Sequence, residues 1–284
     1  MPALAPGGGL PPEPPELFVY VLRLSCDRYY VGTTRDVARR FDEHCGTKGA
    51  VKGAAFTRAY PPLEIIESRA CHAYEEDKVT KQMMAIYGVT CVRGGSYCQC
   101  QLPDGTVAVL TRELRNVALF RGVPLSIYVI ELTGGKFFVG AAPADGRGPS
   151  VLKGAAAAWI SAHLPVVKHV STAAAFDLFE AEAVARQYMA HFGIENVRSL
   201  SHCALVLDAD TLRVLKAEVA TAAGTCFLCG ETRHCRDACP QLRAADAGAT
   251  TPPRGLAANG ALCVLCGSPA HAAGDCDASS ADDT

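Results

Sequence analysis

The sequence lacks both a long hydrophobic run and a marked excess of either charge. No apolar stretch approaches the ~18 residues that a membrane-spanning helix needs, so we expect no membrane span. The formal net charge is only −2, so any attraction to nucleic acid has to come from local patches. Residues 1–16 have six prolines and three glycines, but neither the charge nor the apolar centre of a signal peptide. We expect this segment to be a disordered leader.

Cysteine, in contrast, is abundant, with 14 residues in the chain. A secreted disulfide scaffold would use many cysteines, but six of these fall in metal-ligand spacing and no secretion signal is found. The remaining eight are scattered and are interpreted as reduced thiols; even Cys91, Cys98 and Cys100 are taken as buried thiols rather than a metal site. We therefore expect an intracellular protein, without a choice between nucleus and cytoplasm.

The chain contains an internal repeat. The stretch MAIYGVTCVR at 84–93 recurs as MAHFGIENVR at 189–198, an offset of 105 residues. Apolar runs at 18–22 and 125–130 begin the two cycles, and each is followed by a short turn and a second β-rich run. Two copies of about 100 residues indicate duplication of a whole domain rather than a solenoid. We expect α+β domains at 17–120 and 121–221, each with a small antiparallel sheet flanked by helices.

Several local signals set the expected helices of the first copy. Thr34 or Asp36 can cap a helix that runs to His44. A third strand is expected at 63–66, and a helix over 72–87 should end at Gly88. Asp104-Gly105 is interpreted as a turn before a further helix at 111–120.

Five side chains of the first copy form a constellation suited to phosphodiester chemistry. Tyr20 lies in the middle of the first expected strand, and Tyr30 begins the second. Arg40 and His44 are four residues apart and therefore share one helix face. Of the three acidic residues that open the next helix, Glu76 continues the apolar stripe, and a carboxylate on a buried face is costly unless it is paired or binds a metal. Asp77, one residue further, remains the alternative.

These motifs resemble the GIY-YIG endonuclease family. Phe18-Val19-Tyr20 stands where the family has its first triplet, and Tyr30-Val31-Gly32 stands for the second. Phe18 departs from the family's usual glycine. The segments 74–78 and 92–95 look like those of family members in large DNA viruses and protists. The resemblance covers residues 17–100 well and 125–205 weakly.

The resemblance implies a role for each member of the constellation. Glu76 would hold one divalent ion, Mg²⁺ or another, which prefers oxygen ligands. Tyr20 would act as general base toward water, with Tyr30 relaying the proton. Arg40 would neutralise phosphate charge, and His44 would orient the phosphate or the tyrosines.

The second copy is expected to be degenerate. It keeps Tyr128 and Gly140, but Phe138 replaces a tyrosine and Ala181 stands at the position of Glu76. Gly148 or Arg147 lies near the position of Arg40. We expect this copy to serve packing or substrate holding.

Beyond residue 225, two clusters share the spacing C-x₂-C-x₄-H-x₄-C that is typical of zinc knuckles. Each is expected to bind one structural Zn²⁺, which has to supply the folding energy of so short a module. The modules span 226–239 and 263–276, with a flexible linker at 240–262 and an acidic tail at 277–284. The expected ligands are Cys226, Cys229, His234, Cys239, Cys263, Cys266, His271 and Cys276.

The leading functional prediction is a metal-dependent endonuclease that acts on DNA, possibly single-stranded or branched, with knuckles that aid nucleic-acid binding. Two alternatives stay open. One is a nucleic-acid-binding protein that has lost activity. The other is a protein-interaction adaptor, suggested by the acidic end of the chain, where residues 221–284 hold 4 basic and 7 acidic residues.

Overall fold

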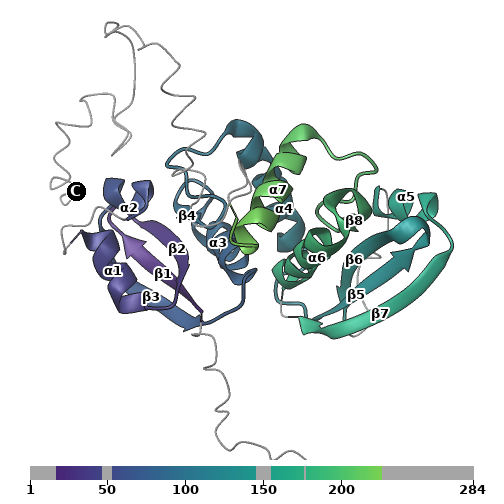
Figure 1. Cartoon of the computed structure of the whole chain (residues 1–284), viewed down its shortest axis with the longest axis horizontal. Helices are drawn as coiled ribbons and strands as arrows, with labels where there is room; N and C mark the ends of the chain where they lie inside the picture. The colour runs from purple at the N-terminus through teal and green to yellow at the C-terminus, as the bar shows by residue number, and fades with distance from the viewer. Residues whose placement is uncertain (1–16, 47–52, 145–154, 176, 226–284) are drawn as a thin grey trace, which may run out of the picture. The chain divides into compact units, whose positions relative to one another are not determined.

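The computed structural model describes residues 17–46, 53–144, 155–175 and 177–225 (Figure 1). Within them, the strands form two four-stranded sheets, of order β3-β1-β2-β4 and β7-β5-β6-β8. The α+β class predicted from the sequence is therefore confirmed. The predicted leader, both zinc knuckles, the linker and the acidic tail lie outside the described residues, as do Arg147 and Gly148.

The first sheet is built on a hairpin of β1 (Phe18–Leu24) and β2 (Arg28–Thr34). Strand β3 (Pro62–Ala70) pairs antiparallel with β1, but β4 (Val92–Gly94) runs parallel to β2. The expectation of an antiparallel sheet was wrong for this strand. Helix α3 (Glu75–Tyr87) packs against β2 and returns the chain to the end of the sheet where β2 and β3 begin. Strand β4 therefore runs in the same direction as β2.

The second sheet has the same pattern of pairing. Strand β5 is antiparallel to β6 and to β7, and β8 is parallel to β6. Gly134 and Gly135, both at positive φ, form the turn between β5 and β6, as expected from the sequence. The strands are β5 (Leu125–Leu132), β6 (Lys136–Pro143), β7 (Val166–Ala175) and β8 (Val197–Ser199).

Strand β1 is buried on both of its faces. Because side chains alternate along a strand, successive residues of β1 enter two different cores. Val19 and Val21 pack in a core with α3 and α4 (Asp104–Ala118). Tyr20, Leu22 and Leu24 pack in a separate core below α1 (Val37–Cys45) and α2 (Ala55–Ala59). The alternation places Tyr20 on the α1 and α2 face of the sheet.

The helix boundaries follow the capping residues in two cases and differ in a third. Asp36 caps α1, its side chain accepting from the Arg39 amide, and Gly88 ends α3 at φ +91°. The turn expected at Asp104-Gly105 is instead the first turn of α4. Pro103 precedes this helix and Asp104 favours its positive end, which outweighs the turn tendency of the dipeptide.

The two halves share their cores through the last helix of each. Val117 of α4 and Phe120 belong to the core of the second half, which also contains α6 (Leu178–Phe192). Val214 of α7 (Ala209–Ala222) belongs to the core of the first half. The cores of the two halves are therefore not independent of each other. Two 3-10 turns, η1 (Thr133–Gly135) and η2 (Ile194–Asn196), and α5 (Ala155–Ala162) complete the described elements.

Among the described residues, no helix combines the length and the apolar character needed to cross a membrane.

Candidate active site

The site begins with a close approach between β1 and β2. Tyr20 and Gly32 are direct cross-strand partners, and the Tyr20 ring lies across the glycine. Any Cβ at position 32 would overlap the phenol, so this position requires glycine for space rather than for backbone conformation. Tyr20 and Gly32 belong to the two motifs that were singled out in the sequence. Their close approach gives a physical reason why a tyrosine in the first motif goes with a glycine in the second.

His44 connects Tyr20 to α2. Its Nε2 lies 2.8 Å from the Tyr20 hydroxyl, and its Nδ1 lies 2.8 Å from the Thr57 hydroxyl. The Tyr30 ring is also adjacent, with a centroid 5.0 Å from that of the imidazole. His44 is 4% exposed and Thr57 is 1% exposed, so this chain of polar groups is buried. Thr57 was missed by the sequence reasoning, because no local pattern marks it.

Arg40 reaches the same phenol from α1. Its guanidinium lies within hydrogen-bonding reach of the Tyr20 hydroxyl and also donates to Glu43, with 2.8 Å between Nη1 and Oε2. Arg40 and His44 share a helix face, as their spacing predicted. A cation half-buried beside a phenol oxygen is suited to an anionic ligand at this position.

Glu76 is held by residues of β2 and of the turn after β4. Its Oε2 accepts from the Thr33 hydroxyl at 2.7 Å, and its Oε1 accepts from the Gly95 amide at 3.1 Å. Burial raises the pKa of Tyr20 and of Tyr30, and the negative charge of Glu76 adds to this shift at both tyrosines. The structure thus brings Tyr20, Tyr30, His44, Arg40 and Glu76 to one site.

The neighbouring carboxylates have other partners. Asp77 accepts from the Ser96 amide at 2.8 Å and from the Ser96 hydroxyl at 2.7 Å, which fixes the turn after β4. Glu182, at the equivalent position of the second half, accepts in the same way from the Ser201 amide at 2.9 Å. This repeated contact gives Asp77 a structural role. Glu75 is buried as well, contrary to the periodicity argument, because Arg69 forms an ion pair with it.

Burial dominates the protonation of the site. It raises the pKa of Tyr20 and of Tyr30 well above the usual range, although Arg40 opposes this shift at Tyr20. Burial and the Arg40 charge lower the pKa of His44 to about 4, so the imidazole is neutral at pH 7. Burial also raises the pKa of Glu76, against the hydrogen bonds from Thr33 and Gly95. A nearby cation would stabilise the charged form of this carboxylate, which burial disfavours.

Among its described residues, the second half lacks several of these groups. Tyr128 lies across Gly140 as Tyr20 lies across Gly32. Phe138, however, has no hydroxyl, and Ala181 is part of an apolar core. Ala141, the partner of Ile127 as Thr33 is the partner of Val19, also lacks a hydroxyl. Among the described residues, the positions of Glu76 and Thr33 thus hold no carboxylate and no hydroxyl in this half.

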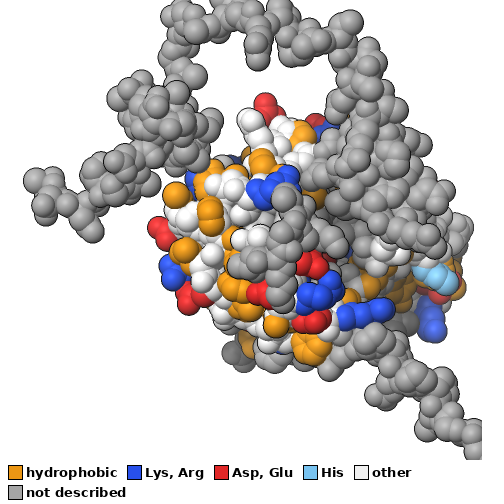
Figure 2. Space-filling view, turned by 60° about the vertical axis from the view of Figure 1, so that its left-hand side comes forward, with side chains coloured by type: hydrophobic (Ala, Val, Ile, Leu, Met, Phe, Trp, Pro, Cys, Tyr) orange, Lys and Arg blue, Asp and Glu red, His pale blue; other side chains and the backbone are white. Residues whose placement is uncertain are grey.

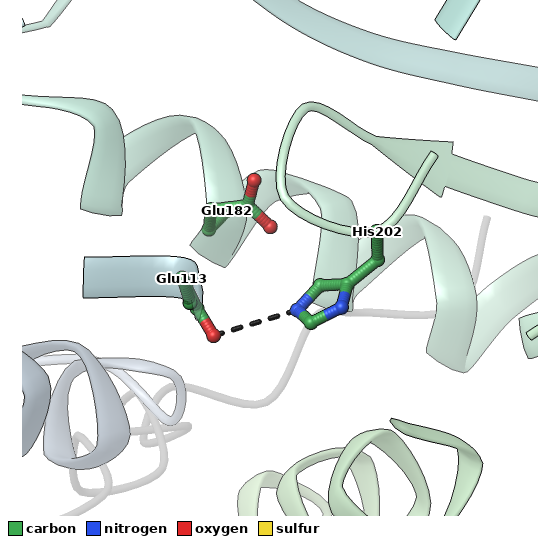
Figure 3. Close-up of side chains that lie close together, drawn as sticks. All are labelled: Glu113, Glu182 and His202. Carbon is green, nitrogen blue, oxygen red and sulfur yellow. Dashed lines mark hydrogen bonds and ion pairs between the residues drawn. The ribbon is translucent and has the colours of Figure 1, made fainter. Parts of the chain in front are cut away.

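A second set of buried charges lies between the halves, and sequence reasoning did not find it. Glu113, Glu182 and His202 converge, with His202 Nε2 3.4 Å from Glu113 Oε2 (Figure 3). Three such ligands could hold a metal ion, but two cations already neutralise them. Lys81 lies 2.8 Å from Glu113, and Arg186 lies 2.9 Å from Glu182. A divalent ion would be repelled by both, so this cluster is an ion-pair network.

In the view of Figure 2, the basic and acidic side chains of the described residues are interspersed with hydrophobic ones. Ion pairs account for part of this mixture, including Arg23 with Glu64 and Arg69 with Glu67. Arg40 within the site is therefore more informative about an anionic ligand than the part of the surface seen in this view.

Comparison with known proteins agrees with this geometry. Residues 16–78 match the model of the GIY-YIG catalytic domain. A UPF0213 protein of Cupriavidus necator is 41% identical over 49 residues, which cover 17% of this chain and 49% of the relative. A UPF0213 protein of Desulfotalea psychrophila is 31% identical over 72 residues, 25% of this chain and 61% of the relative. The chain thus spans only about half to three-fifths of these relatives' length. No solved structure shows a significant match.

Proposed function

We propose that this protein is a metal-dependent endonuclease that hydrolyses DNA phosphodiester bonds at the site around Tyr20. The observation that carries the proposal is the meeting of a phenol, an imidazole, a guanidinium and a half-buried carboxylate within the matched domain. These are the groups that phosphodiester hydrolysis needs: a base, a proton acceptor, a cation for the phosphate and a metal ligand.

The site fits a magnesium ion. Glu76 presents one carboxylate, and each of its oxygens receives only one hydrogen bond, which leaves further lone pairs for an ion. Mg²⁺ commonly binds one or two carboxylates and retains waters, so a single acidic ligand suffices. When bound, such an ion supplies charge stabilisation to the scissile phosphate.

The chain's own residues would prepare the reaction. Arg40 would bind a phosphate oxygen and hold the Tyr20 oxygen nearby. Tyr20 would accept a proton from the attacking water in the same step in which it passes its own proton to His44 Nε2, and the leaving oxygen would take up a proton from solvent. Tyr30 would pack against His44 and limit its movement. The second half would hold the first half in place or contact substrate without cleaving, and the two knuckles would bind nucleic acid through their zinc-stabilised turns.

One observation favours a nucleic-acid-binding protein without activity. Tyr20 and Tyr30 are 1% and 6% exposed, and a general base has to reach the attacking water. The test is to incubate the full chain with supercoiled, branched and single-stranded DNA in Mg²⁺ and in EDTA, and to measure binding and cleavage separately. Cleavage in Mg²⁺ alone supports the endonuclease. Binding without cleavage supports the alternative. A chain that neither binds nor cleaves DNA would favour the protein-interaction adaptor.

A further inference from the structure

The Thr57 hydroxyl lies between His44 and the backbone of α2. Its Oγ1 is 2.8 Å from His44 Nδ1 and 3.0 Å from the Ala54 carbonyl oxygen. A threonine hydroxyl has one hydrogen to donate. A carbonyl can only accept, so the contact with Ala54 uses that hydrogen. Towards His44, Thr57 is then an acceptor, and the imidazole hydrogen has to be on Nδ1.

The Tyr20 end of the imidazole gives the same answer independently. With Nδ1 protonated, Nε2 of the neutral ring has a free lone pair and accepts from the Tyr20 hydroxyl at 2.8 Å. The Tyr20 oxygen can then accept from Arg40. In the opposite tautomer, His44 and Arg40 would both donate to this oxygen, and the Tyr20 hydrogen would compete with them. The Nδ1–H tautomer therefore makes the larger number of hydrogen bonds.

We propose that Thr57 is a positioning residue that fixes His44 as the Nδ1–H tautomer, so that Nε2 is ready to receive the Tyr20 proton. The catalytic consequence rests on the proposed nuclease function, whereas the tautomer itself does not. Thr57 is buried and contacts no reacting atom, so it acts only through His44.

The second half provides an internal comparison. Its α5 corresponds to α2, with Trp159 in the place of Phe56, so Ile160 stands at the position of Thr57. The buried helix can thus be formed without a hydroxyl there. The half that has Phe138 instead of a second tyrosine also lacks this hydroxyl, which ties Thr57 to the site rather than to the fold.

The test compares Thr57→Val with Thr57→Ser in the full chain. Long-range ¹H–¹⁵N NMR correlations report which imidazole nitrogen carries the proton, and the signal that His44→Gln removes identifies His44 among the eight histidines. We expect the Nδ1–H form in the parent and in Thr57→Ser, and the other or a mixed form in Thr57→Val. The turnover number kcat of Thr57→Val should fall roughly tenfold or more with KM little changed, because a wrong tautomer disables the proton acceptor.

The outcomes separate this inference from the proposed function. An Nε2–H signal in the parent overturns it, as does a Thr57→Val variant that keeps both the Nδ1–H form and full kcat. A parent that cleaves no DNA but shows the Nδ1–H form, lost only in Thr57→Val, supports the positioning role and refutes the nuclease. Circular dichroism confirms that each variant is folded; if Thr57→Val unfolds, a Thr57→Ser variant with a changed tautomer would overturn the inference.

Discussion

Lys81 and Arg186 stand at equivalent positions of the two halves, 105 residues apart, and each forms ion pairs with both Glu113 and Glu218. The two glutamates are themselves equivalent, and all four side chains are buried. Tyr97 donates to Glu218 across the boundary, as His202 contacts Glu113 from the other side. The halves therefore meet through an arrangement that repeats itself, like the contact of a two-fold symmetric dimer.

The first prediction concerns this network. Lys81→Met should destabilise the chain by about 3–5 kcal/mol, because removal of one cation leaves buried carboxylates without compensation. Lys216→Met on the exposed face of α7 is the matched control and should change stability by less than about 0.5 kcal/mol. Urea denaturation gives both values. Equal stability of the two variants would show that the network does not hold the halves together.

The second prediction is a pH dependence centred on Asp77. Burial and the Glu218 charge raise its pKa from 3.8 to about 7. Between these values, the unfolded chain has released the proton and the folded chain still holds it. The parent therefore loses stability as the pH rises from about 4 to about 7, by at most on the order of 4 kcal/mol.

Asp77→Asn cannot titrate and isolates this contribution. Relative to the variant, the parent should be most stable near pH 4 and lose that advantage by pH 7, as measured by denaturation at each pH. A stability difference that is constant over this range, or that changes in the opposite direction, would contradict the assignment.

The third prediction is that a carboxylate restored to the second half does not restore chemistry. Ala181→Glu in a Glu76→Gln background should remain inactive, because Phe138 has no hydroxyl and Ala141 cannot donate as Thr33 does. The introduced charge would enter an apolar core, so the variant should also be less stable by several kcal/mol. Ala181→Ser is the small polar control. Recovered cleavage would overturn the view that this half is degenerate.

The fourth prediction concerns the two knuckles. Elemental analysis of reduced protein should find two zinc ions per chain, because each knuckle presents a complete ligand set. Truncation after Thr225 keeps α7 and the Thr225 bonds to Ala220, so single-turnover cleavage at saturating protein should be little changed. Affinity for single strands and its salt dependence should fall, because Arg233 and Arg236 are removed.

Fewer than two zinc ions would refute the ligand assignment. Unchanged single-strand affinity after truncation would instead assign the knuckles to protein contact.

Local chemistry explains what the sequence could predict. The strand around Tyr20, the cap at Thr34 or Asp36 and the stop at Gly88 each depend on a few neighbouring residues, and the structure has the strand, the Asp36 cap and the stop. The spacing of Arg40 and His44 likewise fixes a shared helix face. The constellation could therefore be assembled from short-range patterns.

Long-range packing explains what the sequence could not predict. The hydrogen bond between His44 and Thr57 spans a segment without periodicity, and the parallel pairing of β4 depends on the path of α3. Glu75 can occupy a buried position because Arg69 of the preceding strand β3 and Lys78 of its own helix form ion pairs with it. The ion pairs of Lys81 with Glu218 cross the two halves, so no reading of one half alone could find them.

The most direct test of the account compares Glu76→Gln with Asp77→Asn in plasmid and branched-DNA cleavage with Mg²⁺. Glu76→Gln should abolish cleavage with the fold intact, because the amide keeps the size of the side chain and removes the negative charge that would bind the ion. Asp77→Asn should cleave at near the parent rate, because both Asp77 oxygens accept hydrogen bonds from Ser96 and this side chain is not the one that would bind the ion. Full activity of Glu76→Gln together with loss of activity in Asp77→Asn would contradict the assignment of the site.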